Sequence, residues 1–431
     1  MKAIRDPVHN IILFNKTKEK LLLDLIDTKE FQRLRRIRQL GFSSYTYPGA
    51  EHTRFIHSLG VAHLTNRFIN KISNITGDAL INELVDQRLL ITAAALLHDI
   101  GHGPFSHALE HITKIPHETW TLAIIKGETE VNQVLKTYGI NPWEVAELIQ
   151  RTHKSKAAVK LLSSQLDADR MDYLLRDSMM TGAGYGTFDL EWAINVIRIG
   201  KVNGDIEIGL DREKGLSIAE DFVMARYYMY INVYFHKTTR SAELLVSKIF
   251  TRALELLESN QIEMPEGLAH ILKDGITEKT LNHYINLTDD TFWYFIRLWL
   301  SSSDGIISNL CQRLIKRKLY KAINERVDLF RLVEKANTIS KDTGLPVDYL
   351  ILRDEASSSS YKDYYLQEPK FGEGQSEREA SEQVFLFDRG GKAEELSNIS
   401  DIIRQIRNKK IHIERIYVPE EFKAEIIGGE A

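Results

Sequence analysis

The stretch "LLHDIGHGPFSH", residues 96–107, places three histidines and an aspartate in twelve positions, just after an apolar run typical of a buried helix. Two glycines and a proline follow the first histidine and predict the end of that helix. A helix end can aim the adjacent side chains His98 and Asp99 at one point, which a regular helix rarely allows. The crowding therefore predicts a site at this position.

Composition limits the class of protein and the kind of site. Of the 431 residues, 43% are hydrophobic and 27% are charged, which is enough for a sizeable core. The net charge of −4 gives no general attraction to nucleic acid or to an anionic membrane. Cys311 is the single cysteine, so an internal disulfide and a cysteine-rich zinc site are excluded. Any metal needs histidine and carboxylate ligands.

The sequence predicts no membrane partner. The longest uncharged apolar stretch in the first third, residues 89–97, is about half of the ~18 residues that a membrane span needs. The N-terminus, "MKAIRDPVHN", has no apolar run of the signal-peptide kind. We therefore expect a cytoplasmic protein.

Hydrophobic periodicity predicts a mainly α-helical fold with small β-hairpins. "KAIRDPVHNIILF" is typical of an N-terminal strand or hairpin, and "VNGDIEIGL" (202–210) predicts a second one. Single helices are expected over 79–98 and 217–259. Beyond about residue 325 strands and helices alternate, so we predict a helical first domain (1–325) and a C-terminal α+β unit (326–431) without an obvious catalytic cluster.

The segment "FQRLRRIRQ" predicts an arginine-rich helix. Asp27 followed by Glu30 has the spacing of a capping box, and Gly41 is a plausible end. Four arginines on one helix are, by default, a solvated basic face.

Four segments of the first 180 residues are rich in histidine and aspartate, residue types that can bind a metal ion. They are "EHTRFIHSLG" (51–60), the opening stretch, "IPHETW" (115–120) and "LDADRMDYLLRDS" (166–178). Two imidazoles and two carboxylates would neutralise a divalent ion and leave positions for water and a substrate oxygen. A single His-Asp dipeptide occurs in sequences about as often as chance predicts. The presence of all four segments in this order favours a metal site. His52 and His111 are expected to be structural or surface residues.

The last of these segments also predicts a polar helix face. Asp169, Tyr173, Arg176 and Asp177 follow at i, i+4, i+7 and i+8, so one stripe would carry a ligand at its start and polar contacts farther along.

The order of His57, His98-Asp99 and Asp169 resembles that of the HD-domain phosphohydrolases. Fuller matches, such as "YPGAEHTRFIHSLGV", "DADRMDYLLRDS" and "ARYYMYINVYFHK", resemble the HD-domain deoxynucleoside triphosphate triphosphohydrolases and extend from residue 5 to about 240. The resemblance implies an HD-domain helical core. It also implies hydrolysis of deoxynucleoside triphosphates to deoxynucleoside and inorganic triphosphate.

The resemblance implies one divalent ion per site, with Mn, Fe, Mg, Ni, Co and Zn all open, and further Mg can accompany the nucleotide. The implied metal ligands are His57, His98, Asp99 and Asp169. The implied catalytic residues are His102 and His117, which flank the α-phosphate and of which one protonates the leaving oxygen, Glu110 near His117, and His107 at the phosphates.

For the substrate, the resemblance implies three groups of contacts. Arginine forks bind phosphate oxygens, two polar residues bind the 3′-hydroxyl, and two tyrosines fill the space of a ribose 2′-hydroxyl. The implied residues are Arg54, Arg170 and Arg226 for the triphosphate, Gln39 and Asp177 for the 3′-hydroxyl, Tyr173 and Tyr234 for the excluded hydroxyl, and Leu40 beside them.

The resemblance further implies a guanine nucleotide effector bound between subunits of a homotetramer. The implied effector residues are Asp27, Gln32, Arg35 and Phe55 on one wall, and Arg212, Lys214 and Lys237 at phosphate-holding positions of the partner chain.

Two alternatives stay open at this point. A generic HD-domain phosphatase or phosphodiesterase would use the same metal ligands. A non-catalytic nucleotide or single-stranded nucleic-acid binder would use basic segments such as "RLIKRKLYK" (313–321), although nucleic acid is not the favoured partner.

Overall fold

The computed structural model describes residues 1–75, 79–105, 107–323, 328–359, 361 and 383–427, without the side chains of residues 79, 80, 107, 108 and 111. The protein is mainly helical, as predicted. The helices in the N-terminal half are α1 (Lys20–Ile26), α2 (Lys29–Arg33), α3 (Arg54–Ser73), α4 (Ala79–Asp86), α5 (Arg88–Leu97), α6 (His107–Thr113), α7 (His117–Lys126), α8 (Glu130–Thr137), α9 (Pro142–Ile149), α10 (Lys156–Leu162), α11 (Ala168–Thr181) and α12 (Leu190–Asn195). They are followed by α13 (Leu216–Met229), α14 (Lys237–Glu258), α15 (Glu266–Asp274), α16 (Glu278–Tyr284), α17 (Asp289–Leu298), α18 (Gly305–Ile315), α19 (Leu329–Thr343), α21 (Leu396–Ile399), α22 (Asp401–Ile406) and α23 (Lys423–Ile427).

The described residues form three small sheets. The predicted N-terminal hairpin is present as antiparallel β1 (Lys2–Asp6) and β2 (Asn10–Phe14). The second hairpin consists of β3 (Ile197–Val202) and β4 (Asp205–Asp211), so its first strand begins five residues before the predicted range 202–210. The strands are joined at Asn203 and Gly204, both with positive φ as a tight hairpin turn requires. β7 (Phe385–Phe387) pairs in parallel with β4 and antiparallel with β8 (Ala393–Glu395). The third sheet has the order β5 (Lys321–Ile323), β9 (Lys410–Val418), β6 (Leu352–Ser359).

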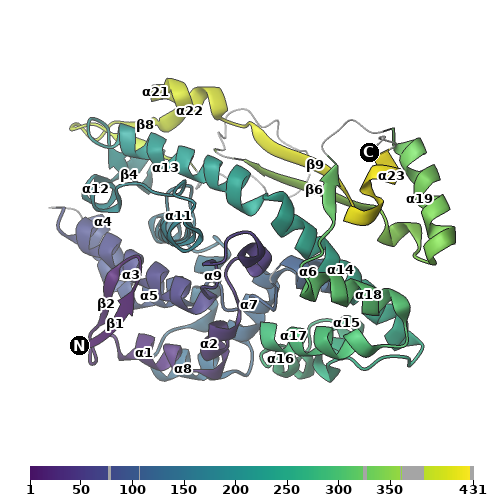
Figure 1. Ribbon diagram of the computed structural model, residues 1–431. Coiled ribbons are helices and arrows are strands. Elements are labelled where there is room, and N and C mark those ends of the chain that lie inside the picture. The colour runs from purple at the N-terminus through teal and green to yellow at the C-terminus, as the bar shows by residue number, and fades with distance from the viewer. Residues whose placement is uncertain (76–78, 106, 324–327, 360, 362–382, 428–431) are drawn as a thin grey trace.

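The domain boundary predicted near residue 325 stays a prediction. Strand pairing joins residues on its two sides, because β4 pairs with β7 and β5 pairs with β9. Leu386 and Tyr417 belong to the main hydrophobic core, whereas Leu332 and Ile426 belong to a smaller core between α19 and α23. Figure 1 shows these C-terminal elements above the long line of α13 and α14, with the N-terminal helices below it.

Helices α3, α5 and α11 form the centre of the N-terminal part and position the site. Helix α5 is the most deeply placed, because its residues 90–97 are all buried, and it packs along α3. Helix α11 packs on α3 (Figure 1). The apolar run that precedes His98 is therefore a buried helix, as its sequence predicts.

The predicted arginine-rich helix is shorter than expected. Helix α2 ends at Arg33, and its N-cap is Thr28 instead of Asp27, with Thr28 Oγ1 accepting a hydrogen bond from the Phe31 amide. The side chain of Arg33 is buried whereas Arg35 and Arg36 are exposed, so the arginines form a solvated basic face only in part.

Both long predicted helices are interrupted. The helix expected over 79–98 breaks at Gln87 into α4 and α5. The one expected over 217–259 contains a π-helical turn, Tyr230–Tyr234, after which His236 caps α14. A π turn inserts a residue into the helical repeat and turns side chains to a new direction, and such turns are frequent at functional sites. No described helix combines the length and the apolar character that crossing a membrane demands.

Candidate active site

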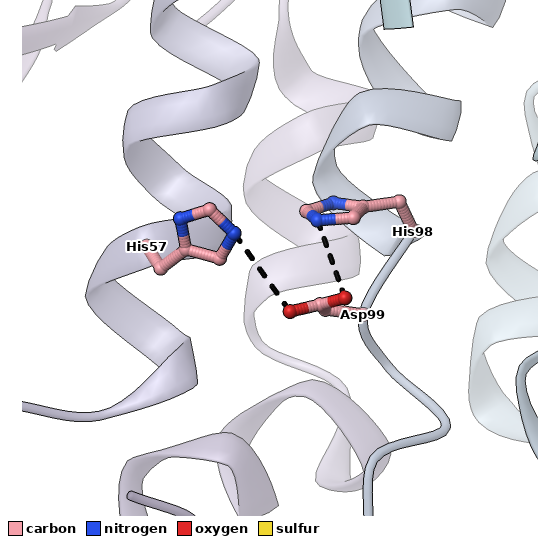
Figure 2. A group of neighbouring side chains, drawn as sticks. All are labelled: His57, His98 and Asp99. Carbon is pink, nitrogen blue, oxygen red and sulfur yellow. Dashed lines mark ion pairs between the residues drawn. The ribbon is translucent and has the colours of Figure 1, made fainter. Parts of the chain in front are cut away.

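Four titratable side chains from separate segments converge at the centre of the molecule. His57 lies in the first turn of α3, His98 and Asp99 follow α5, and Asp169 lies in the first turn of α11. His57 Nε2 is 3.1 Å from Asp169 Oδ1 and 3.7 Å from Asp99 Oδ2. His98 Nε2 is 3.4 Å from Asp169 Oδ1 and 3.3 Å from Asp99 Oδ1. Figure 2 shows the two rings approaching Asp99 from two segments, and we name these four residues the buried cluster.

Both imidazoles of the buried cluster are fixed through their other ring nitrogen. His98 Nδ1 donates to the Ala95 carbonyl at 2.8 Å, and His57 Nδ1 lies 2.8 Å from Asp172 Oδ2. A ring that donates from Nδ1 keeps the lone pair of Nε2 for a metal ion. Nε2 of His98 is buried and has no hydrogen-bond partner among the described residues.

The buried cluster fits a divalent cation. His57, His98 and Asp99 each offer a ligand atom, and these atoms lie within 4.8 Å of one another. Burial lowers the pKa of His57, but hydrogen bonds to Asp169 and Asp172 outweigh burial and raise that pKa to about 10. Burial works to raise the pKa of Asp169, and the neighbouring His98 and His57 lower it overall. Two imidazoles and two carboxylates suit a borderline divalent metal and balance its charge.

A buried ionic network behind His57 escaped the sequence analysis. Asp172 accepts from Arg176 Nε at 2.7 Å and lies 2.6 Å from His9 Nε2, and Arg176 Nη1 donates to Asp6 at 2.9 Å. Arg176 was expected on the face of Asp169, but it is fully buried and turned to Asp172 instead. The only signal in the sequence is Asp172 itself, three residues after Asp169.

Gly60 of α3 leaves the space that Asp172 and Arg176 occupy. A Cβ at Gly60 would lie 1.9 Å from Asp172 Oδ1 and 2.5 Å from Arg176 Nη2. The glycine one turn after His57 is therefore required by the close approach of α11, and any larger residue there would displace the carboxylate that fixes His57.

A second histidine pair adjoins the buried cluster. The rings of His102 and His117 are stacked, with centroids 3.6 Å apart, and His102 Nε2 is 3.4 Å from Asp99 Oδ1. His117 Nδ1 lies 2.5 Å from Glu110 Oε1, so these two predicted neighbours do meet. Burial, with Arg54 adding to it, holds the pKa of His102 well below its usual value. The side chain of His107 lies outside the description, so its predicted phosphate contact stays a prediction.

The glycines after His98 serve close packing. A Cβ at Gly101 would lie 2.1 Å from the Thr121 amide nitrogen, and one at Gly103 would lie 2.5 Å from Leu109 Cδ2. Neither glycine has the left-handed backbone that only glycine adopts freely, whereas Phe105 has φ of 52°. The segment after α5 therefore packs so closely against α7 and α6 that a side chain at either glycine would clash.

Three buried side chains hold this turn. Arg33 donates from Nη2 to the carbonyls of Ile100 at 2.9 Å and His102 at 2.7 Å. Tyr284 of α16 donates its hydroxyl to the Gly101 carbonyl at 2.6 Å. Asp289 accepts from the backbone amides of Phe105 and Arg38 at 3.0 and 2.9 Å. Hydrogen bonds from Arg33, Tyr284 and Asp289 therefore fix the backbone of the segment that follows α5.

A pocket of about 270 Å³ lies beside the buried cluster. Tyr173, one helical turn after Asp169, lines it from α11, and Phe105, three residues after His102, lines it from the segment that follows α5. Five residues predicted to bind the substrate line it together: Gln39, Leu40, Tyr173, Asp177 and Tyr234. The π-helical turn supplies Tyr234, so the interruption that the sequence did not predict shapes this pocket.

Asp177 is one of the charged residues that line the pocket. Its two oxygens lie 2.8 Å from the Tyr234 hydroxyl, which donates, and 2.8 Å from His52 Nε2. His52 is buried, in keeping with the structural role expected of it. The rings of Tyr173 and Tyr234 meet edge to face with centroids 6.1 Å apart. Gln39 Oε1 is buried without a hydrogen-bond partner in the described part of the chain.

The three arginines predicted to bind phosphate lie near these groups. Arg54 forms a buried ion pair with Asp99, and Arg170 pairs with Asp167 at 3.0 Å. The guanidinium of Arg226 lies 5.6 Å from the centroid of the Tyr230 ring. Tyr230 and Tyr173 both line the pocket, and the charges of Arg226 and Arg170 oppose the rise that burial and Tyr230 cause in the pKa of Tyr173.

Part of the predicted effector wall is assembled within the chain. Arg35 Nε donates to Gln32 Oε1 at 2.8 Å, and its guanidinium lies 3.6 Å from the centroid of the Phe55 ring. Gln32 Nε2 donates to the Ile26 carbonyl, next to Asp27.

The other predicted effector residues lie elsewhere. Arg212 pairs with Glu394 at 2.5 Å, Lys214 precedes α13 and Lys237 begins α14. These residues are predicted to act in a partner chain, which a single chain does not test.

Comparisons with known proteins agree with this geometry. Residues 54–177 match the HD domain family, and residues 204–353 match the HD associated region. The uncharacterized protein YwfO of Bacillus subtilis is 38% identical over 97% of this chain and 92% of its own length. The deoxynucleoside triphosphate triphosphohydrolase SAMHD1 of Bos taurus is 28% identical over 78% of this chain and 61% of its own length.

A solved structure has the same architecture throughout. The crystal structure of a phosphohydrolase from Bacteroides thetaiotaomicron has a TM-score of 0.79 at 27% identity and covers 97% of this chain and 99% of its own. The matched HD domain begins and ends at residues of the site, Arg54 and Asp177, and it contains the whole buried cluster. The chain belongs to the HD-domain family and has the HD phosphohydrolase fold.

Proposed function

We propose that this hydrolase converts deoxynucleoside triphosphates to deoxynucleoside and inorganic triphosphate. The observation that carries the proposal is the pocket beside the buried cluster, where the unpartnered Gln39 Oε1, Asp177 and two tyrosines lie together. A carboxylate and an amide oxygen suit a sugar hydroxyl, and aromatic walls suit a ring without a further hydroxyl. A relative named as a deoxynucleoside triphosphate triphosphohydrolase supports the same substrate class.

His57, His98, Asp99 and Asp169 would hold the divalent ion. When bound, such an ion supplies Lewis-acid chemistry, activating water and withdrawing charge from a phosphoryl oxygen. Asp172 and the Ala95 carbonyl orient the two imidazoles toward it.

One of the stacked histidines would donate a proton to the leaving group. Hydrolysis at the α-phosphorus breaks its bond to the 5′-oxygen, which needs a proton as it leaves. His117 is the better placed donor of the pair, because Glu110 fixes its ring through Nδ1, as a catalytic histidine is oriented by a neighbouring carboxylate. Arg54, Arg170 and Arg226 would neutralise the charge on the triphosphate.

The tyrosines would reject ribonucleotides. A 2′-hydroxyl placed against Tyr173 and Tyr234 would lose its water and meet an aromatic edge, while Asp177 already accepts from Tyr234 and contacts His52. An unpaired buried hydroxyl costs about 1–3 kcal/mol. We therefore expect a preference for deoxyribose of about tenfold or more.

A product assay tests the proposed reaction. The purified protein is incubated with each deoxynucleoside and ribonucleoside triphosphate over a panel of divalent ions, and products are separated by chromatography. We expect deoxynucleoside and tripolyphosphate. Orthophosphate release, or cleavage of a cyclic dinucleotide to a linear one in a parallel incubation with that substrate, would favour a generic HD-domain phosphatase or phosphodiesterase instead.

We also propose that a guanine nucleotide activates the protein as a homotetramer. The contacts of Gln32, Arg35 and Phe55 support a nucleotide site, because a guanidinium over an aromatic ring is ready to hold a base or phosphate. Activity and light-scattering mass are measured with and without dGTP or GTP. A rate and a mass that no nucleotide changes would contradict this part alone.

A further inference from the structure

A second group of histidine and carboxylate side chains lies on the surface between α15 and α16. Glu266 and His270 are one turn apart on α15, and His283 lies in the last turn of α16. Their ligand atoms lie within 4.8 Å of one another, and His270 Nε2 is 3.6 Å from Glu266 Oε1. We propose that Glu266, His270 and His283, named here the surface cluster, bind a second divalent transition-metal ion of the zinc type.

The packing of the two helices brings the surface cluster together. Gly267 follows Glu266, and a Cβ there would lie 2.8 Å from the Cβ of His283. Any other residue at this position would push α16 away and carry His283 out of reach of His270. The glycine therefore does for the surface cluster what Gly60 does for the buried one.

His270 is oriented as a metal ligand. Asp274 Oδ2 lies 3.3 Å from His270 Nδ1, one turn farther along α15. A carboxylate at Nδ1 fixes the ring and leaves Nε2 to the ion, the usual arrangement behind a metal-binding histidine. The rings of His270 and His283 are nearly parallel, at 5° with centroids 5.3 Å apart, so both can turn an edge to one point.

The donor set selects the class of ion. Two ligands at about 2.1 Å from a tetrahedral ion lie about 3.4 Å apart, close to the present spacing of Glu266 and His270. Two imidazoles and one carboxylate suit Zn²⁺ and its neighbours Co²⁺, Ni²⁺ and Cu²⁺ much better than Mg²⁺ or Ca²⁺. The Glu266 side chain is 81% exposed, so it can close on the ion without displacing the fold, and water completes the coordination.

An ion at the surface cluster would stabilise the position of α16, which supports the segment that follows α5. His283 precedes Tyr284, whose hydroxyl donates to the Gly101 carbonyl and whose ring stacks on Trp120 with centroids 3.9 Å apart. Linking α16 to α15 therefore fixes Tyr284 under the turn. The surface cluster shares no residue with the buried cluster, so its occupancy is independent of the proposed reaction.

Metal counting tests the proposal. The full-length protein is equilibrated with Zn²⁺ by dialysis, and bound ions are counted by mass spectrometry of the digested protein. We expect two ions per chain in the wild type and one in His270→Asn/His283→Asn. The exposed His412 is the matched control, and His412→Asn should keep two. A double variant that binds as many ions as the wild type would overturn the proposal.

A milder variant protects the test against a folding failure. Asp274→Asn keeps all three ligands and replaces the carboxylate behind His270 by a neutral, weaker acceptor, so Zn²⁺ affinity at this site should fall about 10-fold in a competition with a chromophoric chelator. His98→Ala/Asp99→Ala should keep the surface ion, which separates this inference from the proposed function. Unchanged affinity in Asp274→Asn would contradict the orientation of His270 that the inference requires.

Discussion

The buried cluster and the surface cluster contain similar types of side chain but differ in their surroundings. Both combine histidines with carboxylates, and both rely on a glycine that lets two helices meet. His57 of the buried cluster has a side chain 1% exposed, whereas His270 of the surface cluster is 29% exposed. Behind His57 stand Asp172 and Arg176, both fully enclosed, and behind His270 stands the solvent-accessible Asp274.

This difference teaches what burial adds to a metal site. Charged groups that are buried away from water need partners, and the buried cluster therefore carries an ionic network, which fixes the His57 ring through Asp172. In the surface cluster one carboxylate, Asp274, supports His270, and the exposed Glu266 side chain can change its conformation. We expect the buried ion to support chemistry on a bound substrate and the surface ion to exchange readily and to act on stability.

The largest expected effect is loss of the buried cluster itself. His98→Ala/Asp99→Ala removes two of four ligands and should reduce hydrolysis by roughly a thousandfold or more, together with loss of the buried ion. Turnover and metal content are measured on the same sample, with His412→Asn as the control. A double variant that stays fully active without a metal would contradict the metal site.

The next effect tests the network that only the buried cluster has. Asp172→Asn leaves Arg176 buried with a single remaining carboxylate, Asp6, and should lower the free energy of unfolding by about 3 kcal/mol. Affinity of the buried ion should fall about 10-fold because His57 loses its partner. Urea unfolding and metal competition measure the two, against Asp221→Asn at an exposed position. Equal behaviour of the two variants would refute the role of the network.

A smaller effect of pH also distinguishes buried from exposed carboxylates. Burial raises the pKa of Asp289 to about 6, above its value in the unfolded chain, so its contribution to stability is full at low pH and is lost as pH rises through 6. The free energy of unfolding of Asp289→Asn relative to the wild type should improve by about 1.4 kcal/mol between pH 5 and 7.5. Exposed Asp221→Asn should show no such trend, and a constant difference for Asp289→Asn would count against this shift.

The smallest expected effect concerns the pocket beside the buried cluster. Tyr173→Leu opens the wall that would exclude a 2′-hydroxyl, and the preference for deoxynucleotides should fall about tenfold. The ratio of kcat/KM for a deoxynucleotide and the matching ribonucleotide is the readout, and Tyr228→Leu, at an exposed tyrosine, is the control. An unchanged ratio would mean that Tyr173 does not discriminate.

The four residues proposed as metal ligands were named by the resemblance to the HD-domain phosphohydrolases, and the sequence patterns had already marked the segments that contain them. His98 and Asp99 end an apolar helix, and Asp169 begins a helix with polar residues at helical spacing. The supporting groups were not predictable in the same way. Arg33 and Asp172 are polar residues whose burial depends on neighbours far apart in the chain, and a local pattern assigns such residues to the surface.

The fold shows the same division. The hairpin at Asn203-Gly204 follows from local turn chemistry and was predicted, whereas the π turn at Tyr230–Tyr234 was not, because the apolar repeat continues through it. Thr28 replaces Asp27 as the cap of α2, a difference of one residue that periodicity does not resolve.

The most direct test of the central claim is a crystal structure of the protein with Mn²⁺ and a non-hydrolysable deoxynucleoside triphosphate, using the anomalous signal of the ion. We predict an anomalous peak bonded to His57, His98, Asp99 and Asp169, with the α-phosphate between that peak and the stacked His102 and His117 and the sugar against Tyr173. Nucleotide bound away from these four side chains, or a peak only at other positions, would contradict the account.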